Sequence, residues 1–344
     1  MTDDGSRNKD PAEKTINKVS TRNISKIPQG LNTKFMNLTT RLLLAAFSLL
    51  SLLPLRLLYC ISDIGFVLMY YMVRYRRHIV RQNICSAFPE KDDAWVTATE
   101  RGFYRWFCDY FMEAVKLLTI SDRQLRRRFT VEGADEVEKC FSEGQDAAAI
   151  LGHYCNWEWL SCVGIALKPE RKCGLIYHPL RSQAFDILFQ RLRSSQPSSM
   201  VVPKKDILRS LLTLRREGTR SLFGYIADQG PKWENIHLWL PFLNHDTPVF
   251  TGAERIMRKM HDAVFYVDMT RPRRGYYTCR FHLITRTPQD LPEYEVTRRF
   301  FQLLEQTIRR DPRFYLWSHN RWKRTHEEFD RKFIVVDGKV LPRK

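Results

Sequence analysis

The sequence predicts an α/β fold in which helices flank a central sheet, preceded by a membrane-associated helix. From residue 147 onward, short apolar runs alternate with helical patterns, which is typical of a sheet with connecting helices. Apolar residues also dominate the stretch from Leu42 to Val73. With 344 residues, 44% of them apolar, the chain can form one large domain plus appendages.

Three regions are expected in order along the chain. Residues 1–41 form a polar flexible tail, because the first 33 are rich in Lys, Asn, Ser and Thr with few aromatics. Residues 42–80 form a membrane anchor with a basic flank, and residues 81–344 form the folded domain. The apolar stretch starts too late for an ordinary cleaved leader, so it is expected to stay in the protein.

Pro54 and Arg56 divide the apolar stretch into two halves. As helices, Leu42–Leu55 covers roughly 21 Å and Leu57–Val73 roughly 26 Å, and both fall short of the ~30 Å hydrocarbon core. A tilted or kinked helix embedded in one leaflet therefore fits as well as a single crossing. The alternative is a buried helical hairpin that covers the domain, and Asp63 in the second half gives that alternative weight.

A cluster of basic residues follows the apolar stretch directly, at Arg74, Arg76, Arg77, His78 and Arg81. We expect it to rest on anionic head groups, at about 1 kcal/mol per charge, on the cytoplasmic face of the membrane. The net charge of +18 suits anionic lipids, phosphorylated sugars, acidic carrier proteins or nucleic acid. Unpaired cysteine usage suits a reducing cytoplasm.

Aromatic residues with helical spacing between residues 84 and 130 predict a packed helical layer. Beyond this layer, apolar runs predict strands at 147–151, 173–177, 221–227, 263–269 and 277–285. Helical patterns lie near 183–195, 205–217, 250–261 and 293–310. A ligand crevice is expected at the carboxyl ends of the strands.

A histidine stands just after the first of these strands, and a glutamate follows it five positions later. Gly152 permits a tight exit from the strand, and Asn156 is a good N-cap for a helix that runs to about Leu167. His153 then precedes the helix and Glu158 lies in its first turn, so the carboxylate can hold one imidazole nitrogen. The other nitrogen can accept a proton from a hydroxyl, which makes His153 and Glu158 a candidate acid/base pair.

Other interpretations of this segment stay open. His153 can be a hydrogen-bonded structural residue, and Cys155 can be a thiol nucleophile or a packed apolar side chain. A zinc site is disfavoured because the chain lacks His-Glu-x-x-His and Cys-x-x-Cys, and its eight cysteines show no ligand spacing. No Gly-x-Ser-x-Gly elbow indicates a serine hydrolase. Non-covalent general-base catalysis is the simplest chemistry for the pair, and it requires neither a metal nor a cofactor.

The His-x4-Glu spacing of His153 and Glu158 resembles the signature of the bacterial lipid A biosynthesis acyltransferases of the lauroyl/myristoyl type, within the HX4D/E lysophospholipid-acyltransferase-like superfamily. Other blocks resemble that family's elements in the same order: Asn83–Pro89, Phe189–Arg193, Ala227–Gln229, Pro241–Phe242 with Thr251–Gly252, and Trp317–Lys323. The likeness covers residues 42–325. Leu243-Asn244 replaces the usual Phe-Gly, and the Cys-Asn-Trp interior of the first motif is expected to alter acceptor or chain-length preference.

The resemblance implies a glycerolipid-acyltransferase-like fold with a mixed central sheet flanked by helices. It also implies an inner-membrane enzyme that moves a fatty acyl chain from a thioester, of acyl carrier protein or of CoA, to a hydroxyl of a lipid A precursor. His153 would be the general base, and Glu158 would stabilise its imidazolium. The implied partners are the thioester, the lipid acceptor and the membrane, without nucleic acid.

Further residues in the matching blocks are expected to bind substrate. Arg193 and Arg191 would contact a phosphate, or would be ordinary charges on a helix surface. Asp228 would position a hydroxyl or an arginine, although Asp-Gln-Gly-Pro is also common turn chemistry. Asn156 and Arg321 complete the set, and the aromatic tail around Arg321 is expected to pack on the active-site side rather than bind nucleic acid.

Two rival functions stay open on the sequence alone. A related acyltransferase would keep the same pair but use another lysophospholipid, glycolipid or amino-lipid as acceptor. A non-enzymatic basic adaptor for membranes or nucleic acid would tolerate loss of both residues and would bind anions in a salt-dependent way.

Overall fold

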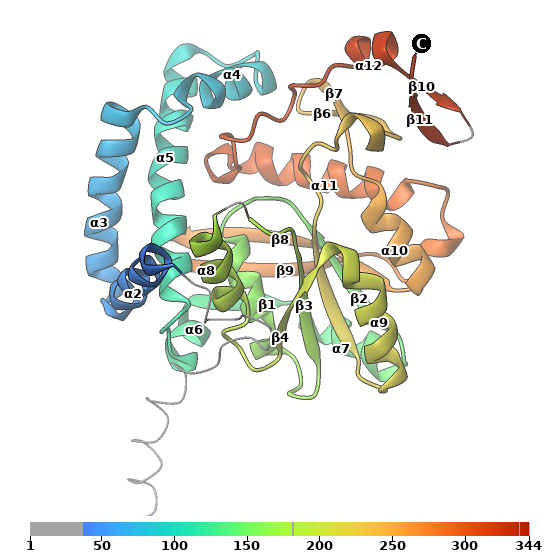
Figure 1. The fold of residues 1–344 in the computed structure, drawn as a ribbon, viewed down its shortest axis with the longest axis horizontal. Coiled ribbons are helices and arrows are strands. Elements are labelled where there is room, and N and C mark those ends of the chain that lie inside the picture. The colour runs from blue at the N-terminus through green and yellow to red at the C-terminus, as the bar shows by residue number, and fades with distance from the viewer. Residues whose placement is uncertain (1–36, 181, 337, 344) are drawn as a thin grey trace, which may run out of the picture.

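The computed structural model describes residues 37–180, 182–336 and 338–343, so most of the expected polar tail lies outside the described residues. A mixed seven-stranded sheet flanked by helices forms the centre, which confirms the predicted fold class (Figure 1). The strand order is β1-β9-β8-β2-β5-β3-β4, and neighbours run parallel except for the antiparallel pair β8 and β9. The strands of this sheet are β1 (Phe129–Glu132), β2 (Ala147–Leu151), β3 (Lys172–Tyr177), β4 (Ser199–Pro203), β5 (Ser221–Ile226), β8 (Ala263–Arg273) and β9 (Tyr276–Thr285).

Two small hairpins lie apart from the main sheet and beside the C-terminal helix α12 (Figure 1). They are β6 (Trp239–Phe242) with β7 (His245–Pro248), and β10 (Phe333–Val336) with β11 (Lys339–Pro342). The α-helices are α2 (Leu38–Leu52), α3 (Leu55–Val67), α4 (Arg77–Ala87), α5 (Asp93–Lys116), α6 (Asp122–Arg128), α7 (Ala134–Ser142), α8 (Gln183–Arg193), α9 (Ile207–Arg216), α10 (Gly252–Met260), α11 (Glu295–Arg310) and α12 (His326–Lys332). Short 3₁₀ turns are η4 (Lys204–Asp206), η5 (Trp233–Asn235), η6 (Pro288–Asp290) and η7 (Pro312–Phe314).

The predicted strands correspond to β2, β3, β5, β8 and β9, and the predicted helices correspond to α8, α9, α10 and α11. The packed helical layer is confirmed by α5, which buries Phe103, Tyr104, Trp106 and Tyr110. The sequence does not predict β1 and β4. Both are short edge strands, and so few residues give a weak alternation signal. The helix expected after Asn156 is a 3₁₀ helix instead, η3 (Trp157–Ala166).

Pro54 separates the two N-terminal helices as predicted. Leu53 is extended, with φ −60° and ψ 144°, because the residue before a proline is kept out of the helical region. The buried Lys116 of α5 donates its Nζ to the carbonyls of Ser51 and Leu53, at 2.8 and 3.0 Å. This lysine therefore satisfies carbonyls that the interrupted helix leaves open.

The second N-terminal helix packs along α5 by one face only (Figure 1). With its π-helical continuation η2 (Leu68–Val73), α3 forms a segment from Leu55 to Val73, the one described helix long and apolar enough to cross a membrane. One face buries Leu55, Leu58, Ser62 and Phe66. The other exposes Leu57, Ile61, Ile64, Val67 and Leu68, so a fully buried hairpin does not describe this segment.

Several arginines of the expected basic flank form ion pairs or hydrogen bonds within the protein. Arg77 and Arg81 of α4 pair with Glu100 of α5 at 2.6 and 3.1 Å, and Glu100 is fully buried. Arg76 donates to the carbonyl of Ser318 at 3.0 Å. Because a buried carboxylate is strongly unfavourable without paired cations, these arginines fasten α4 to the domain.

Candidate active site

The two central parallel strands bring a histidine and an aspartate together at their carboxyl ends. In the register of β2 and β5, Leu151 is opposite Ile226, and His153 and Asp228 each lie two residues beyond the end of their strand. The Nδ1 atom of His153 lies 2.6 Å from Oδ1 of Asp228. This edge of a parallel sheet is where α/β folds bind ligands, so the predicted location of the site is consistent with the geometry.

The loop after β2 is shaped by a close approach and by backbone strain. A Cβ atom on Gly152 would lie 2.7 Å from the end of the Leu304 side chain on α11, so any larger residue would require Leu304 to move. Cys155 has a φ of 51°, an unfavourable value for a residue with a side chain. Its N–H donates to the carbonyl of Phe314 at 2.9 Å, which helps to hold this conformation.

The C-terminal segment supports the same loop, which agrees with the expected packing of the aromatic tail. Leu316 donates its N–H to the carbonyl of His153 at 3.1 Å. The Asn83 side chain donates to the carbonyls of Trp317 and His319, at 2.8 and 2.9 Å. Two blocks that the resemblance groups together, far apart in the sequence, are therefore joined directly.

The contacts of the imidazole indicate its tautomer. Asp228 is buried and its pKa is lowered, because the raising effect of burial is outweighed by His153. An ionised Asp228 accepts a hydrogen bond from Nδ1–H, which leaves Nε2 as an acceptor. The side-chain amide nitrogen of Gln229 lies 3.3 Å from that Nε2. Nε2 is thus the ring nitrogen that does not contact Asp228, and 18% of the His153 side chain is accessible.

Glu158 does not contact His153 in the way the spacing predicts. It is 1% exposed and forms a bidentate ion pair with Arg193 of α8, with both N–O distances 2.7 Å. Tyr110 and the Trp157 indole also donate to it, at 3.2 and 3.1 Å. The carboxylate is thus fully engaged on the side of α5 and α8, and Asp228 takes the place expected for it beside the imidazole.

Asn156 does not cap a helix, and its side chain is engaged elsewhere. It is fully buried, and its amide donates to Glu113 of α5 at 2.8 Å. Tyr277 of β9 donates to the same carboxylate at 2.6 Å. The expected capping role is therefore wrong, since the Asn156 side chain forms no hydrogen bond with the backbone amides of the helix that follows it.

The other two candidate residues, Arg321 and Arg191, lie in different surroundings. Arg321 is 3% exposed, donates to the carbonyl of Pro248 at 2.8 Å, and has its pKa lowered by burial. A Cβ on Gly230 would lie 3.1 Å from Nη1 of Arg321, which places the guanidinium against the turn that follows Asp228. Arg191 lies half-buried in the last turn of α8.

Two residues that sequence reasoning did not assign to the site, Gln229 and His319, also lie near His153. Gln229 contacts His153 directly, and only its position in the Asp-Gln turn could have indicated it. His319 is close enough to His153 and Asp228 to interact with them electrostatically. Burial lowers its pKa to about 4, so it is neutral near pH 7.

Alternative chemistries for this segment find no support in the geometry. The Cys155 thiol is fully buried, and burial raises its pKa well above the usual value, which disfavours a thiolate nucleophile. All eight cysteines are free thiols. The described residues contain no cluster of three His, Cys, Asp or Glu side chains that could hold a metal ion.

Comparisons with known proteins agree with the resemblance of the motifs. The family model described as bacterial lipid A biosynthesis acyltransferase matches residues 31–324. The chain is 22% identical over 250 residues to a lipid A biosynthesis palmitoleoyltransferase of Escherichia coli (strain K12), covering 72% of this chain and 79% of that protein. It is equally similar, over the same shares, to a lipid A biosynthesis acyltransferase of Shigella flexneri. The chain is thus an acyltransferase and belongs to the bacterial lipid A biosynthesis acyltransferase family.

Proposed function

We propose that this acyltransferase transfers a fatty acyl chain from an acyl thioester to a hydroxyl of a lipid A precursor, with His153 as general base. The observation that carries the proposal is the contact of 2.6 Å between His153 and the buried, ionised Asp228. It holds the imidazole in the tautomer that a base requires, with Nε2 unprotonated.

The proposed reaction proceeds without a covalent enzyme intermediate. The acceptor hydroxyl displaces the Gln229 amide from Nε2, gives its proton to that nitrogen, and attacks the thioester carbonyl carbon. The carbonyl oxygen becomes an oxyanion, and nearby amide or basic donors stabilise it. Collapse of the tetrahedral intermediate breaks the carbon–sulfur bond, and the imidazolium returns the proton to the leaving thiolate. Asp228 stabilises the imidazolium while it carries that proton.

Within this proposal Glu158 acts through Arg193 rather than through the imidazole. The ion pair uses Nε and one terminal nitrogen of Arg193, which leaves the other terminal nitrogen for a substrate phosphate. Arg193 is 19% exposed on its side chain, so a ligand can reach it. Arg191 is proposed to assist at the same helix end, while Asn156 and Arg321 position the loops on either side of the base.

Acyl carrier protein is the proposed donor, with acyl-CoA as the alternative. The formal charge of +18 favours an acidic protein partner, since complementary charge speeds association. A phosphorylated acceptor suits the same surface. Because the chain belongs to an enzyme family, the non-enzymatic adaptor is set aside.

The proposed location is the cytoplasmic face of the inner membrane, with α3 lying in the surface of one leaflet. One face of α3 packs on α5 through buried polar contacts, including a hydrogen bond of 2.6 Å from Ser62 to Asp109. A spanning arrangement would break these contacts in hydrocarbon, where lost hydrogen bonds are expensive. The exposed face, with Ile64 and Leu68, suits a shallow interfacial position.

The test is mass spectrometry of total lipids and the lipid A fraction from cells with and without this protein. Loss of one acyl chain from lipid A, restored by the wild-type chain but not by His153→Ala, is the expected result. Loss from another lipid class would preserve the chemistry and replace the acceptor by a lysophospholipid, glycolipid or amino-lipid. An unchanged lipid profile would contradict the proposal.

A further inference from the structure

A cavity of about 650 Å³ lies between α3, α5 and the tip of the β8–β9 hairpin. Five arginines line it: Arg105, Arg271, Arg273, Arg274 and Arg313. Two carboxylates, Asp63 and Asp109, are also in the lining, and Arg313 pairs with Asp311 just outside it at 2.7 Å, so five positive and three negative charges leave a formal excess of +2. None of the residues assigned above to substrate binding belongs to this lining.

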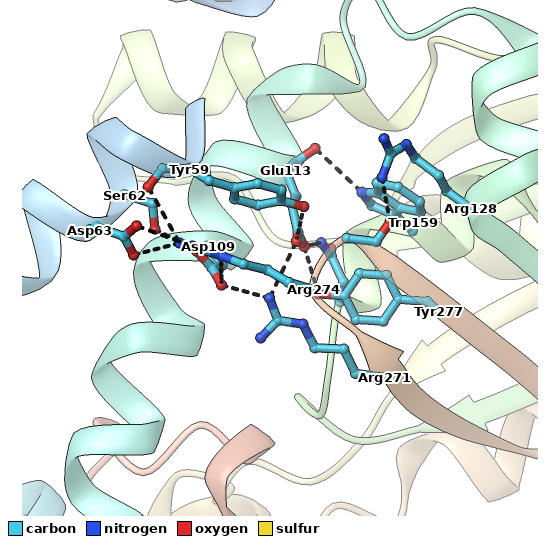
Figure 2. Close-up of polar contacts among 12 residues, drawn as sticks. Tyr59, Ser62, Asp63, Asp109, Glu113, Arg128, Trp159, Arg271, Arg274 and Tyr277 are labelled. Atoms are coloured by element: carbon cyan, nitrogen blue, oxygen red, sulfur yellow. Dashed lines mark hydrogen bonds and ion pairs between the residues drawn. The ribbon is translucent and has the colours of Figure 1, made fainter. Parts of the chain in front are cut away.

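The two carboxylates in the lining pair with arginines of the β8–β9 hairpin. Asp109 lies 2.6 Å from Arg271 and 2.6 Å from Arg274, and Asp63 lies 2.7 Å from Arg274. Figure 2 shows Arg274 between the two carboxylates, while one terminal nitrogen of Arg271 points away from both. These pairs fix the hairpin against α3 and α5, so the cavity is preformed.

Arg105 and Arg273 form no ion pair with a carboxylate in the described part of the chain. The Arg105 guanidinium lies 5.0 Å from the ring centre of Phe66, and that of Arg273 lies 3.7 Å from the ring centre of Tyr276. Stacking on a ring orients the guanidinium plane and leaves the N–H donors at its edge available. These two cations are therefore free to bind an external anion.

The cavity adjoins the exposed apolar face of α3. Val67 is in its lining and is 49% exposed. The opposite wall includes Trp106, whose ring packs on Trp157 at 6.1 Å, and Trp157 in turn packs on His153 at 5.1 Å. An amphiphile with an anionic group in the cavity can therefore keep its apolar part on α3, with an aromatic layer between the cavity and the base.

We propose that this cavity binds the phosphate group of an anionic lipid at the membrane surface. An arginine fork pairs with carboxylate or phosphate oxygens, but a phosphate monoester presents three acceptor oxygens and about −1.5 to −2 charges, so it can engage several arginines at once, which a single carboxylate or a phosphodiester does less well. The excess positive charge supplies affinity, and the exposed apolar face of α3 favours a lipid over a free anion. Binding requires no thioester donor, so this proposal stands or falls independently of acyl transfer by His153.

The test is sedimentation of the purified full-length chain with phosphatidylcholine vesicles that also contain phosphatidic acid. Vesicles with a carboxylate-headed lipid at equal surface charge provide the comparison. The double variant Arg105→Gln/Arg273→Gln should bind phosphatidic acid vesicles about 25-fold more weakly, at about fivefold per arginine near a membrane surface. Its thermal midpoint should match wild type, because neither arginine is in an ion pair.

The matched control is Arg216→Gln/Arg331→Gln, which removes two exposed arginines outside the cavity lining that, like Arg105 and Arg273, form no ion pair within the described residues. It should retain most of the binding, and His153→Ala should retain all of it. Equal losses in the two double variants, or equal binding of phosphate and carboxylate vesicles, would overturn the proposal. Complete displacement by micromolar inorganic phosphate would assign the cavity to a free anion and overturn the lipid assignment.

Discussion

The replacement Asp228→Asn tests the pairing on which the proposed mechanism depends. It keeps the size of the side chain but removes the charge that lies 2.6 Å from Nδ1 of His153. A hydrogen bond to a charged group contributes about 1.5–3 kcal/mol, which corresponds to roughly 10- to 150-fold in rate. Loss of the required tautomer adds to this, so we expect kcat to fall by roughly 10²- to 10⁴-fold.

The dependence of rate on pH gives a second and more specific readout. Without the anion the imidazolium is less stable, so it loses its proton at a lower pH. The acidic limb of the pH–rate profile of Asp228→Asn should therefore move to lower pH while its plateau falls. The assay is transfer of a radiolabelled acyl chain by purified protein across the pH range, at saturating donor and acceptor.

The matched control is Glu158→Gln, which removes a charge from the neighbouring ion pair instead. It should weaken acceptor binding through Arg193 and leave the acidic limb in place. The reasoning is refuted if Asp228→Asn keeps the wild-type plateau. It is also refuted if Glu158→Gln, rather than Asp228→Asn, moves the acidic limb, because Glu158 would then be the partner of the base.

Three further outcomes are expected. His153→Ala should lower turnover by roughly 10²- to 10⁴-fold while the protein stays folded, and near-normal turnover would contradict its proposed role as base. Ile64→Glu/Leu68→Glu should release the protein from vesicles without unfolding it, since both side chains are exposed; continued sedimentation with vesicles would point to another anchoring surface. Burial and Asp146 raise the pKa of Asp262 from 3.8 to about 7, so the stabilising contribution of its protonated form is lost as the pH rises toward and through 7. Asp262→Asn should therefore flatten the decline of the unfolding free energy between about pH 4 and 7, and an unchanged slope in denaturant titrations would count against this.

The sequence predicts where the candidate site lies better than it predicts which side chains contact each other there. The apolar run from Ala147 to Leu151 marks β2 with its observed bounds, because a central strand buried on both faces is apolar throughout. His153 follows directly from that strand. The partner of His153 comes from β5, which lies 75 residues further along the chain, and only the pairing register of the two strands reveals it.

Local spacing predicts Glu158 as the partner of His153. In the structure, a tertiary contact makes Asp228 that partner instead. Glu158 lies in a 3₁₀ helix, where Arg193 from α8 and Tyr110 from α5 engage it. Asn156 also has a distant partner, because its amide donates to Glu113 of α5, while its side-chain oxygen bonds no amide of the following helix. Residue types alone cannot show such contacts, since each partner belongs to a distant element.

The sequence leaves open, for a comparable reason, whether the apolar segment Leu55–Val73 is buried or exposed. Pro54 predicts the break between α2 and α3, since its effect on the preceding residue is local. In the sequence, Asp63 favours a buried helical hairpin. In the structure, Asp63 lies at the edge of the exposed apolar face and pairs with Arg274 of the hairpin. The charge is accommodated beside an apolar surface by a cation that the sequence places more than 200 residues later.

The support of the catalytic loop by the C-terminal segment has a consequence for biosynthesis. Synthesis proceeds from the N-terminus, so the apolar helices α2 and α3 leave the ribosome long before Phe314 and Leu316 exist. Until those two residues arrive, the loop that carries His153 lacks the backbone partners that hold it. A nascent chain can therefore present its apolar helices well before the loop that carries His153 is held in place.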